Sequence, residues 1–132
     1  MDFRKQLSHS EFDVMHIAWG KKPPITAALI LGEMSEKKDW KLATATTLLV
    51  RLVEKGFLRS EKVGRARFFY PIASKEDYVA YETKQFMERY HNNSVESFLE
   101  SLYADLDPAD IDASSNEIIK TIDRLNAKTG LV

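Results

Sequence analysis

Apolar residues recur at helical spacing in three stretches of the first 55 residues. Residues 10–19, 26–36 and 43–55 each place large apolar side chains mostly three or four positions apart, the spacing of one helix face. Polar residues fill most of the positions between them. The pattern predicts three short amphipathic helices, with Ser10 and Thr26 as N-caps of the first two.

Glycine and proline mark the ends of these helices. Gly20 and Gly56 follow the first and third helix, and glycine accepts the left-handed geometry that commonly ends a helix. Pro23 and Pro24 favour an extended connector, because proline cannot continue a helix. Ile25 is therefore predicted to lie in a very short strand.

The apolar stripes also predict the core of this part of the chain. The second helix is expected to pack on the first through an apolar stripe, and the third helix to be buried along one face. Trp19 and Trp40 lie at junctions between elements, where an aromatic side chain commonly locks helices together, so we expect them in the core rather than stacked on bases. The stripe residues are Leu29, Ile30 and Met34 in the second helix, and Ala45, Leu48, Leu49 and Leu52 in the third.

Two strand-like segments follow the third helix. Residues 57–63 and 66–70 flank Gly64-Arg65, a pair suited to a tight hairpin because glycine tolerates positive φ at the first turn position. Three helices followed by a hairpin with a basic tip is the element order of a winged helix-turn-helix. The fold class is thus mainly α with a small β-hairpin, and residues 1–72 are predicted to form a winged-helix DNA-binding domain.

Beyond residue 73 the pattern is purely helical. Helices are predicted over residues 74–91, 95–103 and about 115–127, each with an apolar stripe. Helices of this length do not enclose a core by themselves, so burial against a second copy is expected, and residues 73–132 are predicted to be a helical dimerisation domain. The predicted dimerisation residues are Val79, Phe86, Tyr90, Phe98, Leu99, Leu102, Ile118, Ile119, Ile122 and Leu125.

Charge divides along the same line. Residues 1–70 contain 13 Lys and Arg against 8 Asp and Glu, whereas residues 71–132 contain 6 against 12, so a net charge of −1 conceals a basic half and an acidic half. A basic half is typical of a module that contacts phosphates. Chance segregation in a small protein is the alternative.

An ordered set of short motifs resembles the penicillinase repressor family of transcriptional regulators, the BlaI, MecI and CopY type. The resemblance extends over most of the chain and is looser in the C-terminal half. The motifs are Ser10-Glu11-Phe12-Asp13-Val14-Met15, Trp19, Lys38-Asp39-Trp40, Thr44, Thr47-Leu48, Arg51-Leu52, Lys55-Gly56-Phe57-Leu58 and Phe68-Phe69-Tyr70.

The resemblance implies a homodimer that represses promoters at inverted repeats of double-stranded operator DNA and is induced by loss of DNA binding. Ala43 and Thr46 stand where related members often carry a basic residue, so base contacts would come chiefly from threonines and from aliphatic contact with thymine methyls. The chain has no Asn-Phe pair and no cysteine, the features used by the β-lactam-responsive and copper-responsive members. A sensor-protease partner is therefore unsupported.

The outer face of the third helix and the hairpin supply the candidate DNA contacts. Threonines and an arginine would read bases or position the backbone, and basic residues beside the helix and on the hairpin would neutralise phosphates. A solvated helix face and solubilising hairpin charges are the alternatives. The candidates are Lys41, Thr44, Thr46, Thr47, Arg51, Arg65 and Arg67.

Other classes of function lack sequence support. No phosphate-binding loop, dinucleotide fingerprint or metalloprotease motif occurs, so we expect neither an enzyme nor a bound cofactor. His9 and His16 would need further ligands to hold a metal. No apolar run is long enough for a membrane span and no signal peptide is recognisable, which predicts a cytoplasmic protein. A winged-helix protein-interaction module and a regulator with a small-molecule pocket in the helical half remain as alternatives.

Overall fold

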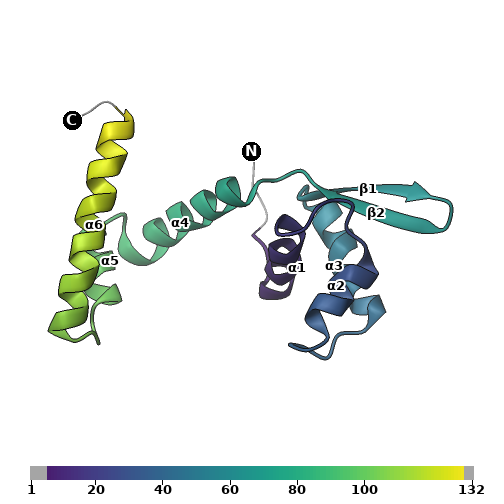
Figure 1. Cartoon of the computed structure of the whole chain (residues 1–132), viewed down its shortest axis with the longest axis horizontal. Coiled ribbons are helices and arrows are strands. Elements are labelled where there is room, and N and C mark those ends of the chain that lie inside the picture. The colour runs from purple at the N-terminus through teal and green to yellow at the C-terminus, as the bar shows by residue number, and fades with distance from the viewer. Residues whose placement is uncertain (1–5, 130–132) are drawn as a thin grey trace. The chain divides into compact units, whose positions relative to one another are not determined.

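The computed structural model describes residues 6–129, shown in Figure 1. These residues form two compact units that divide between Gln85 and Phe86. Each unit is described by itself below.

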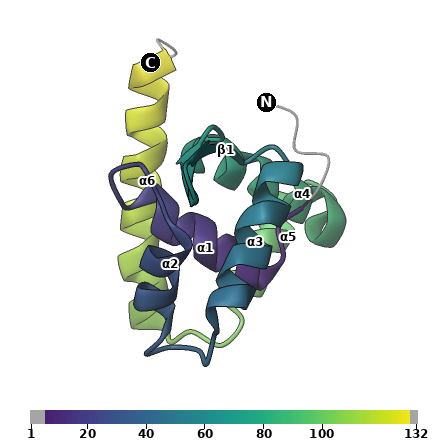
Figure 2. The same ribbon diagram turned by 90° about the vertical axis from the view of Figure 1, so that its right-hand side faces the viewer.

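The first unit contains three helices followed by a two-stranded hairpin, which confirms the predicted winged-helix order. The elements are α1 (His9–Trp19), α2 (Ala27–Met34), α3 (Leu42–Glu54), β1 (Leu58–Val63), β2 (Ala66–Pro71) and the first turns of α4 (Lys75–His91). Figures 1 and 2 show α1, α2 and α3 grouped together, with the hairpin following the end of α3. The unit buries a single cluster of apolar side chains among these elements.

The hairpin has the predicted turn. Val63 pairs with Ala66 across Gly64-Arg65, and Gly64 has φ +62°, as expected for a two-residue turn that begins with glycine. Ile25 forms an isolated antiparallel bridge with Phe69, which confirms the predicted extended segment and ties the connector after α1 to β2.

The start of α4 completes the core of this unit, which the sequence pattern did not predict. Tyr78, the fourth residue of α4, is buried and meets the Phe57 ring edge-on at 5.2 Å between ring centroids. Its hydroxyl accepts a hydrogen bond from the Leu7 backbone N–H at 3.1 Å. Trp19 donates from Nε1 to the Ala73 carbonyl at 2.8 Å. Trp19 and Trp40 are both partly buried against the core, as predicted.

Two predictions about the ends of α1 were wrong. The N-cap is Ser8 rather than Ser10: the Ser8 hydroxyl accepts from the Glu11 N–H at 3.2 Å, and the Glu11 carboxylate accepts from the Ser8 N–H at 2.7 Å. This reciprocal capping box satisfies two amides, which a cap at Ser10 would leave open. Gly20 is right-handed, with φ −90°, because its N–H closes a tighter turn on the Ile17 carbonyl.

The predicted inner stripe of α2 holds for two of its three members. Ile30 and Met34 are buried, whereas Leu29 is exposed. Thr26 caps the helix as predicted, accepting from the Leu29 N–H at 3.1 Å. Gly56 adopts φ +86° after α3, so this glycine does take the left-handed geometry.

The second unit consists of the rest of α4, α5 (Val95–Leu102) and α6 (Pro108–Thr129). The predicted start of α6 near residue 115 was wrong, because the helix begins seven residues earlier at Pro108. Proline suits the first position of a helix, where its missing N–H has no partner to lose. The Asp107 carbonyl accepts from the Asp110 and Ile111 amides and so starts the first turn.

An aromatic cluster joins α4 to α5 at the sharp turn between them. Asn92 and Asn93 both have positive φ, and Ser94 caps α5 by accepting from the Ser97 N–H. The His91 ring lies 5.3 Å from Phe86 and 5.5 Å from Phe98, with Nδ1 3.0 Å from the Ser97 hydroxyl. Among the described residues of this unit, only His91 is buried.

The boundary between the units lies inside α4, whereas the sequence pattern places the change of domain after residue 72. Tyr78 explains the difference, since it attaches the first turns of α4 to the winged-helix core. The assignment of DNA binding and dimerisation to residues 1–72 and 73–132 stays a prediction.

Candidate nucleic-acid interface

One face of α3 is buried and the opposite face is open to solvent. Ala45, Leu48, Leu49 and Leu52 point into the core, as the sequence predicted. The other face carries exposed Ala43, Thr44, Thr46 and Thr47 at the N-terminal end of the helix, followed by exposed Arg51. The N-terminal end of such a helix is the part that contacts base edges in helix-turn-helix proteins.

The threonine hydroxyls of α3 are not equivalent. Thr46 donates to the Leu42 carbonyl at 3.0 Å, and Thr47 donates to the Ala43 carbonyl at 2.9 Å. Thr44 has no side-chain hydrogen bond within residues 6–129, so its hydroxyl is free to donate or accept. A shallow hollow of about 320 Å³ runs along this side of the helix, lined by Ala43, Thr44, Thr47, Leu48 and Arg51.

The basic residues of the first unit divide into those with and those without an acidic partner. Lys21, Lys38 and Lys55 each form an ion pair of 2.6–2.8 Å, with Glu33, Asp13 and Glu11 respectively, and Arg59 lies 3.9 Å from Glu61. Within the described residues, the predicted DNA-contacting cations form none, so their charge is not neutralised inside the protein. They are Lys41, Arg51, Arg65 and Arg67.

Sequence reasoning missed one member of this set. Lys62 lies directly opposite Arg67 in the hairpin register, and both side chains are exposed. Like charges placed opposite each other in a hairpin repel, so this pair weakens the hairpin unless an anion lies between the two cations. Counting residue pairs away from the two-residue turn places Val63 opposite Ala66 and Lys62 opposite Arg67. The sequence alone could therefore have identified Lys62 as a partner of Arg67.

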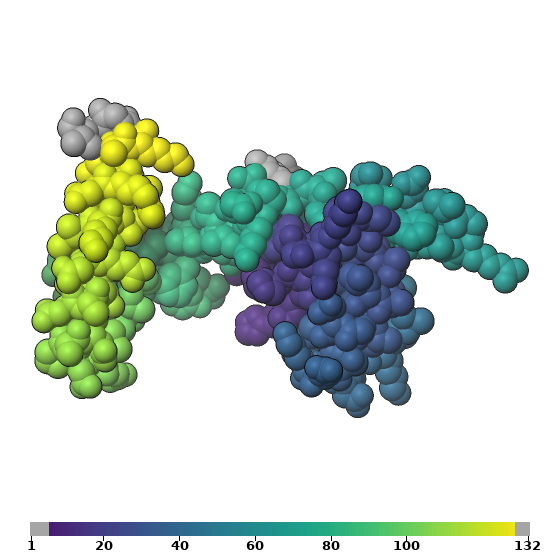
Figure 3. All heavy atoms as spheres, viewed as in Figure 1, coloured from purple at the N-terminus to yellow at the C-terminus, as the bar shows by residue number. Residues whose placement is uncertain are grey.

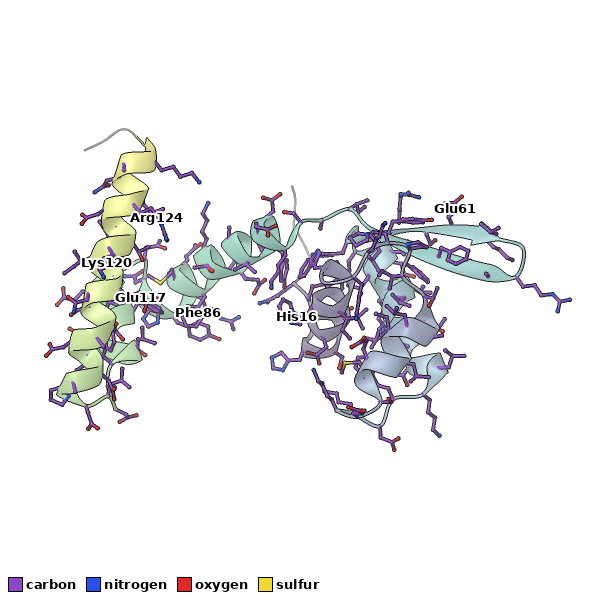
Figure 4. All side chains as sticks on the ribbon, in the orientation of Figure 1. His16, Glu61, Phe86, Glu117, Lys120 and Arg124 are labelled. Atoms are coloured by element: carbon purple, nitrogen blue, oxygen red, sulfur yellow. The ribbon has the colours of Figure 1, made fainter. Side chains whose placement is uncertain are left out.

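The hairpin projects beyond the helices of the first unit, as the space-filling view shows (Figure 3). Lys62 and Arg67 lie on one face of the hairpin. Glu61, labelled in Figure 4, lies on the opposite face, because neighbouring residues of a strand point to opposite sides. Arg59 covers the Tyr70 ring at 4.0 Å from the centroid. The free cations therefore lie near the hairpin tip, and Arg59, which contacts Glu61 and Tyr70, lies nearer its base.

The C-terminal end of α3 is attached to α1 by a partly buried ion pair. The Lys55 Nζ donates to the Glu11 carboxylate at 2.6 Å and to the Gln6 carbonyl at 3.0 Å. Burial works to raise the pKa of Glu11, but the hydrogen bonds from Lys55 and Ser8 outweigh it and leave the pKa lowered. These contacts fix the direction in which α3 presents its outer face.

Residues 7–126 match the sequence profile of the family described as penicillinase repressor. The chain belongs to this family. The penicillinase repressor of Bacillus licheniformis is 31% identical over 94 residues, which cover 71% of this chain and 73% of the relative. The methicillin resistance regulatory protein MecI of Staphylococcus aureus strain N315 is 30% identical over 94 residues, covering 71% and 76%.

The solution structure of the DNA-binding domain of the repressor BlaI is similar to the N-terminal part of this penicillinase repressor family member. It superposes with a TM-score of 0.50 and 32% sequence identity, covering 59% of this chain and 94% of that domain. This agreement, together with the family membership, confirms the winged helix-turn-helix and makes the chain a DNA-binding transcriptional repressor.

The family consists of transcriptional repressors rather than enzymes. Within residues 6–129, no group of three or more His, Asp or Glu side chains is placed to hold a metal ion. None of the helices described here is both long enough and apolar enough to cross a membrane. The roles of individual residues at the candidate interface stay predictions.

Proposed function

We propose that this repressor acts as a homodimer on an inverted-repeat operator and inserts α3 of each copy into successive major grooves, about 34 Å apart on one face of the duplex. Lys41, Arg51, Arg65 and Arg67 bind phosphates, joined by Lys62 opposite Arg67. Thr46 and Thr47, near the N-terminal end of α3, contact bases, and Thr44 contacts a phosphate. Because its partner is the chromosome, we place the protein in the cytoplasm.

The observation that carries this proposal is the division of the cations. Every cation proposed to contact DNA lacks an acidic partner within the described residues, whereas Lys21, Lys38 and Lys55 are neutralised by close ion pairs. A cation without an internal partner keeps its full charge for phosphate, and each phosphate that it neutralises releases condensed counterions. The cations left unpaired include those around α3 and the hairpin tip, and Lys22 and Lys37, which flank α2, also form no ion pair within the described residues.

The second unit supports a homodimer. Its helices leave most of their apolar side chains exposed, among them Phe86 and Tyr90 on α4, Leu102 on α5, and Ile119, Ile122 and Leu125 on α6. Phe98, Leu99 and Ile118 are partly buried. Many exposed large apolar side chains on one small unit are typical of an interface, and a second copy presents the same side chains in a two-fold arrangement. Val79 is exposed on the part of α4 that belongs to the first unit.

The phosphate contacts are tested by the salt dependence of DNA binding. We expect the double variant Arg51→Ala, Arg65→Ala to lower the slope of log K against log salt by about 1.8 for each bound copy, since each phosphate contact contributes about 0.9. Fluorescence anisotropy of the full chain on duplexes selected from a random pool measures this slope. Lys21→Ala is the matched control, because Lys21 is already paired with Glu33 and should leave the slope unchanged.

An unchanged slope in the double variant would place the phosphate contacts elsewhere. A wild-type protein that enriches no sequence from the pool, and that leaves heparin at very low salt, would point instead to a winged helix that docks on protein. Sedimentation equilibrium tests the homodimer separately from both DNA measurements.

A further inference from the structure

One side of the outer face of α3 carries mainly aliphatic and methyl groups. Leu42, Ala43, Thr46, Thr47 and Val50 lie within about 140° of the helix circumference at 3.6 residues per turn. We call these five residues the methyl face. Leu42 is 53% exposed although it is a large apolar residue, and it lies in the first turn, at the end that enters the groove.

The methyl face has little capacity to donate hydrogen bonds. No Arg, Lys, Asn, Gln or His occurs between Lys41 and Arg51. The hydroxyl hydrogens of Thr46 and Thr47 are already directed to the Leu42 and Ala43 carbonyls. Each hydroxyl can therefore only accept a further hydrogen bond, and each threonine adds a methyl group to the surface.

Base pairs differ in how well they suit such a surface. Guanine presents only acceptors, N7 and O6, in the major groove, and the methyl face offers no donor to satisfy them. Thymine presents its C5 methyl group, and adenine presents the N6 amino group as a donor to a threonine oxygen. A·T pairs thus meet both properties of the face, while guanine would be buried against it with its acceptors unpaired.

We propose that α3 selects A·T-rich half-sites by packing its methyl face against thymine C5 methyl groups, with Leu42 as the leading contact. The proposal rests on the DNA-binding function above and specifies the base chemistry of the same site. Thr44 and Arg51 lie on the neighbouring flank of the helix, outside the methyl face, and serve phosphate contact. Leu42 would determine sequence specificity, because it contacts a base directly. The phosphate-binding cations contact the backbone and do not distinguish between bases.

Removing the methyl groups from the DNA alone tests the proposal. A duplex enriched by the full chain from a random pool is resynthesised with deoxyuridine at the thymines of its half-sites, which deletes C5 methyl groups and leaves the base pairing intact. We expect binding to weaken about fourfold for each contacted methyl group, the equivalent of about 0.8 kcal/mol. The control duplex carries deoxyuridine only outside the half-sites and should bind as the thymine form does.

A protein variant assigns the effect to α3. Leu42→Ser should narrow the ratio of affinities for the thymine and deoxyuridine duplexes, because the variant has lost the contact that detects the methyl group. Ile72→Ser is the matched control, since Ile72 is 52% exposed and lies after β2, outside α3, and it should keep the wild-type ratio. Circular dichroism melting checks that both variants fold, and the comparison of duplexes with wild-type protein stands without them.

The outcomes separate this proposal from the proposed function. Equal affinity for the thymine and deoxyuridine duplexes, with selective and salt-dependent binding retained, would overturn methyl recognition and leave the repressor function intact. An unchanged ratio in Leu42→Ser would also overturn it, because the discrimination would then come from DNA shape. Enrichment of no sequence at all would remove the operator binding on which the inference rests.

Discussion

The two units of this repressor use their apolar residues in opposite ways. In the winged helix, residues such as Met15, Leu49 and Phe57 are almost completely buried within one chain. In the second unit, α5 and α6 contain no buried residue in their described parts, although both helices carry a clear apolar stripe. The first unit therefore has its own core, whereas the second needs another surface to supply one.

The stability of the two units therefore has different sources. Burial within one chain contributes at any protein concentration, while burial between chains depends on mass action. If the repressor pairs as proposed, the helical unit depends on protein concentration for its stability, whereas the winged helix does not. The predictions below test this contrast.

The largest effect is expected inside the winged-helix core. Phe57 is buried and contacts Tyr78 edge-on, so Phe57→Ala should lower the free energy of unfolding by about 3–5 kcal/mol. Urea denaturation followed by tryptophan fluorescence measures the loss, since Trp19 and Trp40 both pack against this core. A loss that varied with protein concentration would contradict a core that is closed within one chain.

A smaller effect is expected on α6. Ile122 is 50% exposed in the single chain, and Ile122→Ala should weaken the dimer by about 1 kcal/mol per copy, roughly 30-fold in the dissociation constant. Sedimentation equilibrium measures that constant. Lys120→Ala is the control, because Lys120 lies between Glu117 and Arg124 on a polar stripe of the same helix (Figure 4). Equal effects of the two variants would contradict an interface on the apolar stripe.

The smallest effect concerns pH and the first unit alone. Because the folded-state pKa of Glu11 lies below its ordinary value of 4.5, the ionised carboxylate stabilises the fold fully above pH 4.5, and this contribution is lost as the pH falls through the lowered pKa. We expect Glu11→Gln to flatten the loss of thermal stability below pH 4.5. Glu33→Gln is the comparison: its pKa is also lowered, chiefly by Lys21, but the carboxylate is exposed, so solvent screening should leave a smaller change in the acid profile. Identical acid profiles for Glu11→Gln and the wild type would contradict this role.

Local pattern was sufficient to predict most of the elements. Apolar periodicity placed α1, α2, α3, α4 and α5 to within one or two residues, and Gly64-Arg65 marked the hairpin turn. The errors came at helix ends, where more than one residue is suited to be the cap. Ser8 and Ser10 both precede an acidic residue, and only the spacing from Ser8 to Glu11 allows the reciprocal hydrogen bonds of a capping box.

The candidate interface was only partly predictable in the same way. Composition and periodicity singled out the threonines of α3 and the arginines of the hairpin as exposed. They did not show that Thr46 and Thr47 donate back to their own helix, or that Lys62 lies opposite Arg67. Both facts depend on which backbone atoms lie beside each side chain.

The sequence by itself determined the winged helix-turn-helix, the basic first half and the apolar stripes of the acidic second half, because each follows from the order and spacing of residue types. Only the tertiary structure decided which charges cancel. Lys55 and Arg51 look equivalent in the sequence, yet Lys55 is neutralised by Glu11 from α1 and Arg51 remains free. Ion pairing between residues far apart in the chain depends on how the helices pack, and this packing leaves Arg51 on α3 and Arg65 and Arg67 on the hairpin without an acidic partner among the described residues.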